Sequence, residues 1–419
     1  MRFFAGSGSG GGAGGRGASI LAELREAEWL SRRRVLLDAG VLMVLEIGAT
    51  IFFIALTHGW VVPLVHPTTT DFASFYAAGS LADAGTPHFA YDPVRHHAAE
   101  ELATEPGVGY IFFYYPPIFL MVCAVLARMP YLVAFIAFEL ATLAAFLLVG
   151  RAILRERGWG VLVPLVAFPA VFWTFGVGQN GFLTAALFGA GTMLLDRRPV
   201  AGGLLLGALS FKPQFGLLIP IALAAGRQWR AFLAAAAAVA ALSLLSLMWF
   251  GLDTWRGFFA SLAGSHLTYE SGRIDLGAMI NPFGAVRLVG GSAALAYGVH
   301  AIVALVAAAA VAVVWRRAPA DLPARAATLI AATLLAAPVA LMYDMTLALI
   351  AGAWLVRRGA ERGFLPWEKS LLTVIYLVPL VSRLIGDIWR VPIAPFALAA
   401  LVALGVIHAV SDGTEARAG

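Results

Sequence analysis

Long apolar stretches separated by short polar ones run along most of the chain, from Val35 almost to the C-terminus. Many of them have the length of about 17–25 residues at which an α-helix crosses the hydrocarbon core of a bilayer. Others are shorter and reach across only where the bilayer thins or where their ends are buried in protein. The pattern predicts about twelve membrane-spanning helices. They lie near residues 36–57, 131–150, 160–177, 180–195, 199–211, 214–226, 231–250, 292–315, 325–341, 344–356, 369–386 and 391–410.

Two longer polar stretches interrupt this pattern, near residues 58–130 and 251–290. The end of the first, Phe112–Pro130, is itself apolar and is either a further span or a helix lying in the membrane interface. Tyr114, Tyr115 and the paired prolines after them are typical of an interfacial helix start. We therefore predict interfacial helices in the first polar stretch.

The arginines indicate which ends of the spans face the cytoplasm. Arg32, Arg33 and Arg34 stand just before the first predicted span, so the N-terminus is expected inside. If Phe112–Pro130 does not span, every later arginine cluster falls on the same side. These clusters are RAILRERG (151–158), DRRP (196–199), RQWR (227–230), WRR (315–317) and RRGAERG (357–363). Both long polar stretches then lie on the outer side of the membrane.

The same assignment places several polar residues at the outer ends of their helices. They are the GQNG run at 178–181, Lys212, the pair Tyr343 and Asp344, and Arg383. Polar and ionisable groups at membrane depth are costly to bury, so they usually line a functional cavity. We predict that these residues converge on one site that faces the periplasm or the exterior.

The composition indicates the class of protein. Of 419 residues, 61% are hydrophobic and 13% are charged, with a mean hydropathy of +0.85. A soluble domain carries about 25% charged residues to cover its surface. The chain is therefore predicted to be an all-α, multi-pass protein of the cell membrane, the bacterial inner or plasma membrane, in contact with lipids. The net charge of +5 lies in arginine clusters that set topology, so no nucleic-acid partner is expected.

Three regions are predicted along the chain. Residues 1–34 form a flexible, Gly-rich cytoplasmic tail, 35–410 a multispanning domain, and 411–419 a short cytoplasmic C-terminal tail. Cys123 is the only cysteine, which excludes an internal disulfide.

Asp71 is the strongest candidate for a catalytic base. It begins the run DFASFYAAGSLADAGTPHFAYDP just outside the first span. A carboxylate at the boundary of water and hydrocarbon, beside Phe72 and Tyr76, is partly desolvated. Desolvation raises its basicity and suits it to take a proton from a sugar hydroxyl. The alternative is structural, with Asp71 capping the helix that follows.

Cationic side chains near the outer side can hold an anion such as a lipid phosphate. Lys212 is one of two lysines, and Pro213 interrupts its helix within the bilayer. Alternatively, Lys212 extends to the outer headgroups. Arg383 interrupts an apolar run and either joins the phosphate site or pairs with Asp387 four residues on. The loop arginines that would complete the pocket, unless they are ordinary solvated charges, are Arg256, Arg273 and Arg287.

Four further residues are candidates for binding substrate. Gln179 and Asn180 stand between two spans and either hydrogen-bond sugar hydroxyls or cap the next helix. Asp344 breaks an apolar stretch and either contacts substrate or, as we favour, pairs with one of the cations above. His266, in the second polar stretch, binds phosphate, moves a proton or is an ordinary loop histidine.

His96, His97, Glu100 and Glu101 form two His–Glu pairs spaced four residues apart. They occupy adjacent helical faces and lack a third ligand, so we interpret them as part of a wet amphipathic helix and predict no metal site. No GxGxxG after a strand, no P-loop and no strand–helix alternation indicates a nucleotide site. A transferase acting outside the cell has no cytosolic nucleotide-sugar pool, so it needs a lipid-carried donor. No cofactor is expected.

Three runs together resemble glycosyltransferase family 87 over roughly residues 60–350. They are DFASFYAAGSLADAGTPHFAYDP, FFYYPPIFL and GQNGFLTAALFGAGTMLLDRRPVAGGLLLGALSFKPQFGLLIP. The patterns D…YxAG…YDP, YPP, GQN and AGxLLGxxxxKP occur in that order. Members of this family are multispanning mannosyltransferases that depend on polyprenyl-phosphate mannose.

The resemblance implies a lipid-dependent, all-helical glycosyltransferase fold of the GT-C type, with the active site under the first outer stretch. It implies inverting transfer of a hexose, mannose, from a polyprenyl-phosphate sugar to a glycolipid or glycan acceptor, commonly in an α-(1→2) linkage. Asp71 matches the general base of the family and Lys212 the lysine of its KP motif. Tyr115 belongs to the YPP motif and is a candidate for binding substrate. His266 falls where the family often has a loop histidine.

One departure and several rival interpretations remain. Family members often carry a His-rich motif where this chain reads APVALMYDMT, so Tyr343 and Asp344 lack a family counterpart. The same fold can use polyprenyl-phosphate glucose, galactose or arabinofuranose. A transporter or lipid flippase would use Lys212, Asp344 and Arg383 as an ion path, but the chain shows no inverted repeat and its largest polar segment is an outer loop. An inactive scaffold subunit is the third alternative.

Overall fold

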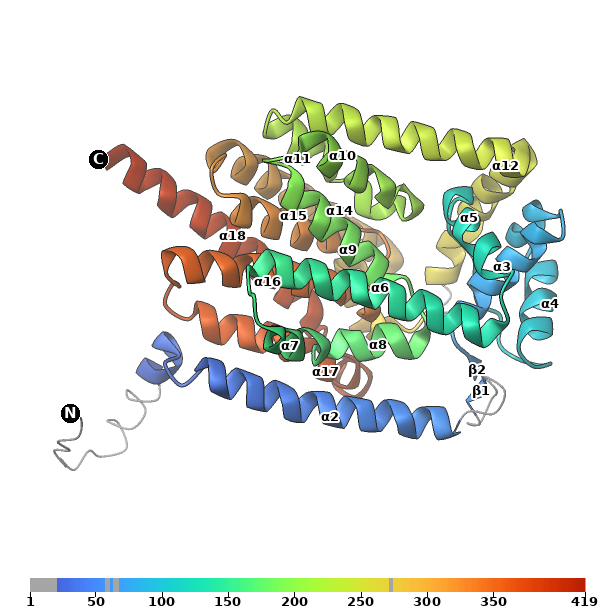
Figure 1. Ribbon diagram of the computed structural model, residues 1–419, viewed down its shortest axis with the longest axis horizontal. Coiled ribbons are helices and arrows are strands. Elements are labelled where there is room, and N and C mark those ends of the chain that lie inside the picture. Colours follow the sequence, from blue (N-terminus) through green and yellow to red (C-terminus); the bar gives the residue numbers. More distant parts are fainter. Residues whose placement is uncertain (1–20, 57–60, 63–67, 271–273, 419) are drawn as a thin grey trace.

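The computed structural model describes residues 21–56, 61–62, 68–270 and 274–418 of the 419-residue chain. This part is mostly helical, and its two short strands, β1 (Val61–Val62) and β2 (Thr68–Thr69), pair antiparallel. The long helices run roughly along the longest axis of the molecule (Figure 1).

Six helices in the described residues are long and apolar enough to cross a membrane. They are α2 (Arg32–Leu56), α6 (Tyr131–Leu154), α12 (Trp229–Glu270), α14 (Ala293–Arg317), α17 (Glu368–Trp389) and α18 (Ile393–Ala418). A seventh span results if two helical segments that meet at an angle of 68° are counted as one. The first segment consists of η2 (Trp159–Val161) and α7 (Leu162–Val166), and the second is α8 (Pro169–Val177).

Shorter helices make up most of the remaining described chain. In order they are α3 (Phe72–Asp83), η1 (Pro87–Tyr91), α4 (Pro93–Ala103), α5 (Pro117–Leu126), α9 (Gly181–Leu194), α10 (Pro199–Ala208), η3 (Leu209–Phe211), η4 (Pro213–Gly216), α11 (Ile219–Ala225), η5 (Leu276–Ala278), α13 (Pro282–Leu288), α15 (Leu322–Ala336), η6 (Met342–Met345) and α16 (Thr346–Arg362). The all-helical membrane architecture is therefore as expected. A helix stands at each predicted span position, but several are short, and the count of about twelve spans stays a prediction.

Helix α10 packs closely against α12 because glycine forms its contact face. A Cβ atom on Gly203 or Gly207 would meet the backbone carbonyl of Ala231 or Ala235. The two glycines are four residues apart, which is the small-xxx-small spacing that lets membrane helices approach. This contact anchors α10, which leads through η3 to Lys212.

Three of the arginine clusters that were predicted to share one side meet at one end of the bundle. Arg155 forms an ion pair with Glu361 (Nη1–Oε1 2.6 Å), and Arg32 forms one with Glu156 (Nη2–Oε2 3.2 Å). The loop after α6, the end of α16 and the start of α2 therefore lie together. We call this the arginine-rich end.

A buried polar network joins the last helices near the same end. Arg358 donates to Asp321 (2.6 Å) and to Nδ1 of His408 (2.6 Å), and His408 Nε2 contacts Glu368 (2.8 Å). All four side chains are buried. Because a buried charge is costly unless it is paired, the network fixes α16, α17 and α18 against the start of α15.

The first polar stretch forms a cap of helices, α3, η1, α4 and α5, at the opposite end of the molecule (Figure 1). Helix α5 has 10 residues and rises about 15 Å, roughly half of the hydrocarbon thickness. Phe112–Pro130 therefore contains no helix long enough to span, in line with the interfacial interpretation. Helix α5 lies directly on α3, where a Cβ atom on Gly79 would meet the carbonyl of Cys123.

The second polar stretch, predicted as a loop over 251–290, is largely helical. Helix α12 breaks at Gly251, whose φ of 77° and ψ of 172° are non-helical, and then continues to Glu270. Further on lie η5 and α13. The sequence marks this stretch as polar, but polarity does not distinguish a loop from an exposed helix.

Candidate functional site

Asp71 lies between β2 and α3 and is held at both its backbone and its side chain. Its N–H donates to the carbonyl of Val177 (2.7 Å), and its Oδ2 accepts from Nε2 of Gln179 (2.9 Å). The Asp71 side chain makes no capping hydrogen bond to α3. The structure therefore directs this carboxylate toward the turn after α8 and not toward its own helix.

The turn that carries Gln179 depends on a glycine. Gly178 has a φ of +69° and ends α8 in the left-handed region that favours glycine. A Cβ atom there would lie 2.8 Å from the Cβ of Phe72, so only glycine lets the turn approach α3. The close approach places Gln179 beside Asp71.

The orientation of the Gln179 amide follows from its other partners. Its Oε1 accepts from the Tyr115 hydroxyl (3.0 Å) and from the backbone N–H of Asn180 (3.2 Å). The amide nitrogen, which can only donate, is then the end that faces Asp71. Tyr115 is itself fixed by Tyr91, whose hydroxyl donates to the Tyr115 carbonyl (2.9 Å).

Asn180 is fully buried and lies beside the Tyr115 hydroxyl. Its side chain does not cap α9, which begins at the next residue. Gln179 Oε1, by contrast, accepts from the backbone N–H at the start of this helix. Contact of either residue with a sugar stays a prediction.

Lys212 occupies the break between η3, which ends at Phe211, and η4, which begins at Pro213. Its side chain is buried, and Nζ lies 2.7 Å from Oδ1 of Asp344. The second oxygen of Asp344 accepts from the backbone N–H of Leu341 (3.0 Å). The ring centroid of Tyr343 lies 4.9 Å from Nζ. The pairing of Asp344 with a cation, which the sequence favoured over direct substrate contact, is present.

Asp71 and Lys212 share one electrostatic environment. Burial raises the pKa of the Asp71 carboxyl, while the hydrogen bond from Gln179 and the positive charge of Lys212 oppose that rise. A carboxylate with a raised pKa is a stronger base, and a nearby cation keeps it ionised. The arrangement combines a proton acceptor with a buried positive charge, as a group-transfer site with an anionic leaving group requires.

Comparison with known proteins decides the class. The sequence profile of glycosyltransferase family 87 matches residues 113–342, which is more than half of the chain. The chain belongs to glycosyltransferase family 87. Among curated proteins and among solved structures, no match is found. With its apolar helices, the protein is an integral membrane glycosyltransferase.

The family match covers part of the site and not all of it. Tyr115, Gln179 and Lys212 lie within the matched range, whereas Asp71 precedes it and Asp344 follows it. Asp71 and Asp344 are therefore assigned to the site by the contacts described above and not by the family match.

Arg383 makes contacts that the sequence did not anticipate in full. Its guanidinium lies 2.8 Å from Asp275 and 3.8 Å from Asp387, and it lies over the ring of Trp173 at 5.3 Å. The ion pair with Asp387 was the structural alternative, and Asp275 adds a second carboxylate. The described contacts thus tie Arg383 to α8 and to the segment before η5, not to Lys212.

The other cations proposed for the phosphate pocket fall into two groups. Arg256 pairs with Asp253 (2.9 Å), and Arg287 donates to the backbone carbonyls of Gly291 (3.0 Å) and Glu270 (3.2 Å). Arg273 and the side chain of His266 lie outside the described residues. The cationic character of the described site therefore rests on Lys212.

Only one of the two His–Glu pairs of α4, His96 with Glu100, departs from the wet helix that we expected. His96 and Glu100 are buried, with Nδ1 and Oε1 3.6 Å apart, and His96 Nε2 contacts the carbonyl of Ser74 (3.1 Å). Burial lowers the pKa of His96 to about 4 and raises that of Glu100 to about 8, so both groups are neutral near pH 7. Their neutrality removes most of the cost of burial, and α4 packs onto the first turn of α3.

Two residues of the site escaped the sequence reasoning. Tyr91 positions Tyr115, and Gly178 allows the turn to dock on Phe72. Tyr91 lies in the YDP run and Gly178 in the GQN run, so the motifs pointed to both positions. The motifs did not reveal which partner each residue serves.

Replacing Gln179 with leucine should move the acidic limb of the pH–rate profile to higher pH. The hydrogen bond from Gln179 lowers the pKa of Asp71, so its loss raises that pKa and leaves less carboxylate at a given acidic pH. The rate should recover at high pH, where Asp71 is ionised again. Initial rates of transfer between pH 5 and 9 test this, with Gln228→Leu, in the turn between α11 and α12, as control. An unshifted acidic limb would show that Gln179 does not act on Asp71.

Proposed function

We propose that the protein transfers a hexose, mannose, from a polyprenyl-phosphate sugar to a glycolipid or glycan acceptor at the outer face of the cell membrane. Transfer proceeds with inversion and forms an α-(1→2) linkage. The observation that carries this proposal is the grouping of Asp71, Gln179 and the buried Lys212–Asp344 pair at helix ends remote from the arginine-rich end. The arginine-rich end faces the cytoplasm in this proposal.

The donor is inferred from the chemistry that the site offers. The chain has no nucleotide-binding sequence pattern, and a site on the outer face has no supply of nucleotide sugars. A lipid-linked sugar is available in the membrane, and its phosphate suits a single buried lysine as counter-charge. The polyprenyl tail would lie between the apolar helices or against α5.

The reaction forms one bond and breaks one. The acceptor hydroxyl oxygen attacks C1 of the donor sugar while Asp71 takes the hydroxyl proton. The bond between C1 and the phosphate oxygen breaks, and the electron pair leaves with the polyprenyl phosphate. Lys212 stabilises the charge that develops on this oxygen, an effect that is large where water is excluded. Attack opposite to the leaving group converts a β-linked donor into an α-mannoside.

Lys212 can contact the donor phosphate while its ion pair with Asp344 stays in place. An ammonium group has three N–H donors, and the contact with Asp344 uses one of them. Lys212 is only 2% exposed, so the phosphate reaches it when neighbouring side chains move. Tyr343 and Phe215, whose rings lie 4.9 and 5.1 Å from Nζ, are the aromatic groups that the donor would displace.

A panel of donors tests the proposal. The purified full-length protein is incubated with a membrane-glycolipid extract and with one donor at a time. The donors are polyprenyl-phosphate mannose, glucose, galactose and arabinofuranose, and a nucleotide-linked mannose for comparison. Products are identified by mass. We expect transfer from the mannose donor with an α-configured product. Transfer from another sugar alone would overturn mannose as the substrate. If no polyprenyl-phosphate sugar is used while a nucleotide sugar is, the lipid-linked donor is wrong.

A further inference from the structure

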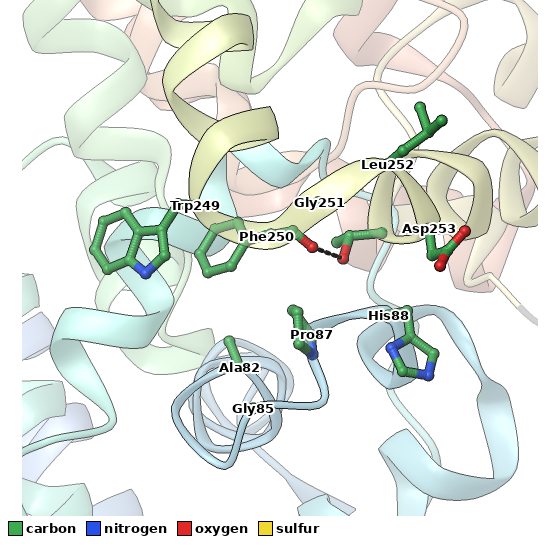
Figure 2. Close-up of a pocket in the computed structure, with 10 residues that line it drawn as sticks. Ala82, Gly85, Pro87, His88, Trp249, Phe250, Gly251, Leu252 and Asp253 are labelled. Carbon is green, nitrogen blue, oxygen red and sulfur yellow. Dashed lines mark hydrogen bonds between the residues drawn. The ribbon is translucent and has the colours of Figure 1, made fainter.

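A cavity of about 330 Å³ opens where α12 breaks, away from Asp71 and Lys212. Figure 2 shows α12 residues along its upper side and the segment from the end of α3 to η1 along its lower side. The side chains that matter below are Trp249, Phe250 and Asp253 from α12, and Pro87 and His88 from η1. We call this the kink pocket.

The kink pocket lies at the level where α12 would leave the membrane. From Trp229 to Phe250 the helix rises about 33 Å, close to the hydrocarbon thickness of about 30 Å. Gly251 then turns the chain with its positive φ. Trp249 is 48% exposed just before this turn, where tryptophan is enriched at membrane–water interfaces.

The lining combines an aromatic surface with polar groups of low net charge. Trp249 and Phe250 supply aromatic rings, while His88 and Asp253 are exposed and lie one above the other in Figure 2. No lysine or arginine lines the kink pocket, although Arg256 pairs with Asp253 from outside it. An anionic phosphate would meet the Asp253 carboxylate without a lining cation. A neutral polyhydroxyl ligand suits the lining, since hydroxyls donate to a carboxylate and a sugar ring can lie on an indole.

The kink pocket is separate from the reaction centre but connected to it. Asp71 and Ala82, at opposite ends of α3, are about 16 Å apart along the helix axis. η1, which supplies His88, also supplies Tyr91. The Tyr91 hydroxyl donates to the Tyr115 carbonyl, and the Tyr115 hydroxyl donates to Gln179, the partner of Asp71.

We propose that the kink pocket binds a sugar ring of the acceptor, at a distance from the hydroxyl that reacts. This inference rests on the proposed function for the term acceptor, whereas sugar binding can be tested without it. Its volume is at the small end of the range for small-molecule sites, roughly 300–1,000 Å³, which suits a compact sugar ring. Contacts with a remote part of a substrate can fix its reacting end, and the separation along α3 implies an extended acceptor.

Equilibrium dialysis of radiolabelled α-1,2-mannotriose against the full-length protein, without donor, tests sugar binding. We expect the wild type to retain the trisaccharide, and Trp249→Ala and Asp253→Asn to weaken binding about tenfold each, because each removes an anchoring group. Both residues are exposed, so folding should be unaffected. Trp229→Ala is the control and should bind as the wild type does, because Trp229 is similarly exposed but lies at the start of α12, away from the kink pocket.

Three results would overturn the proposal. One is a wild type that retains no mannotriose, and another is retention by both kink-pocket variants at the wild-type level. The third is displacement of mannotriose by polyprenyl monophosphate, which would assign the pocket to the donor. Because the dialysis contains no donor sugar, a positive result together with a failed donor panel would refute the proposed reaction and leave the sugar site intact. If mannotriose does not bind but the donor panel succeeds, the sugar site is refuted and the proposed reaction stands.

Discussion

Replacing Asp71 with asparagine should leave the protein folded and lower the rate of sugar transfer by a factor of about 100 to 10,000, the usual contribution of a general base. Asparagine has nearly the same shape, and its carbonyl oxygen can still accept the hydrogen bond from Gln179. It cannot take up the hydroxyl proton. Transfer is measured with purified wild-type and variant protein at saturating donor, and folding by thermal unfolding in detergent.

Asp83→Asn is a matched control, since Asp83 ends the same helix that Asp71 precedes and lies at the surface in a pair with Arg128. This variant should transfer sugar at the wild-type rate. An Asp71→Asn protein that is equally active would show that another group accepts the proton. If Asp71→Asn no longer folds, Asp71 is needed for the structure. Asp71→Glu, which retains a carboxylate, should then restore folding.

Replacing Lys212 with methionine should have the second large effect, on stability and on donor use together. The substitution leaves Asp344 buried without its cation, which costs about 3–5 kcal/mol in comparable buried pairs. Replacing both residues, Lys212→Met with Asp344→Leu, should recover most of this stability, since apolar groups of similar volume often replace buried pairs without loss. The double variant should nevertheless fail to transfer sugar, because no cation would face the phosphate of the donor that we propose. Thermal unfolding and the donor dependence of the rate are the two measurements.

A second buried pair separates stability from chemistry. Arg358 and Asp321 are also buried and 2.6 Å apart, but at the arginine-rich end. Arg358→Met should destabilise the protein comparably and leave the KM for the donor unchanged in the folded fraction. If the double variant at Lys212 and Asp344 transfers sugar like the wild type, the lysine serves only the fold.

Much of the architecture could be predicted because membrane spans are long and apolar. A bilayer forces backbone polar groups to pair within a helix, so an apolar run of sufficient length forms a membrane-spanning helix. The break of α12 at Gly251 was harder, because the residues after it are polar enough for either a loop or an exposed helix. The number of spans is also not fixed by apolarity, since helices such as α9 and α10 are apolar but short.

The sequence predicted which residues belong to the candidate site better than it predicted which of them contact one another. Asp71, Gln179 and Lys212 were identified because polar groups in apolar surroundings are costly. That Gln179 binds Asp71 depends on Gly178 docking against α3, a contact between segments far apart in the chain. The ion pair of Arg383 with Asp275 was not predicted for the same reason, since Asp275 reaches Arg383 from a different segment.

The modest length of α9 has a consequence for how substrates meet. Its 14 residues rise about 21 Å from Leu194 to Gly181, less than the roughly 30 Å of hydrocarbon. If Leu194 lies on the cytoplasmic side, as the proposed topology requires, the site beside Gly181 lies beneath the outer headgroup plane. The polyprenyl donor that we propose would stay embedded at that depth, whereas a hydrophilic acceptor would have to reach below the lipid surface. Acceptors tethered to a lipid, or slender enough to descend, would then be selected over bulky soluble glycans.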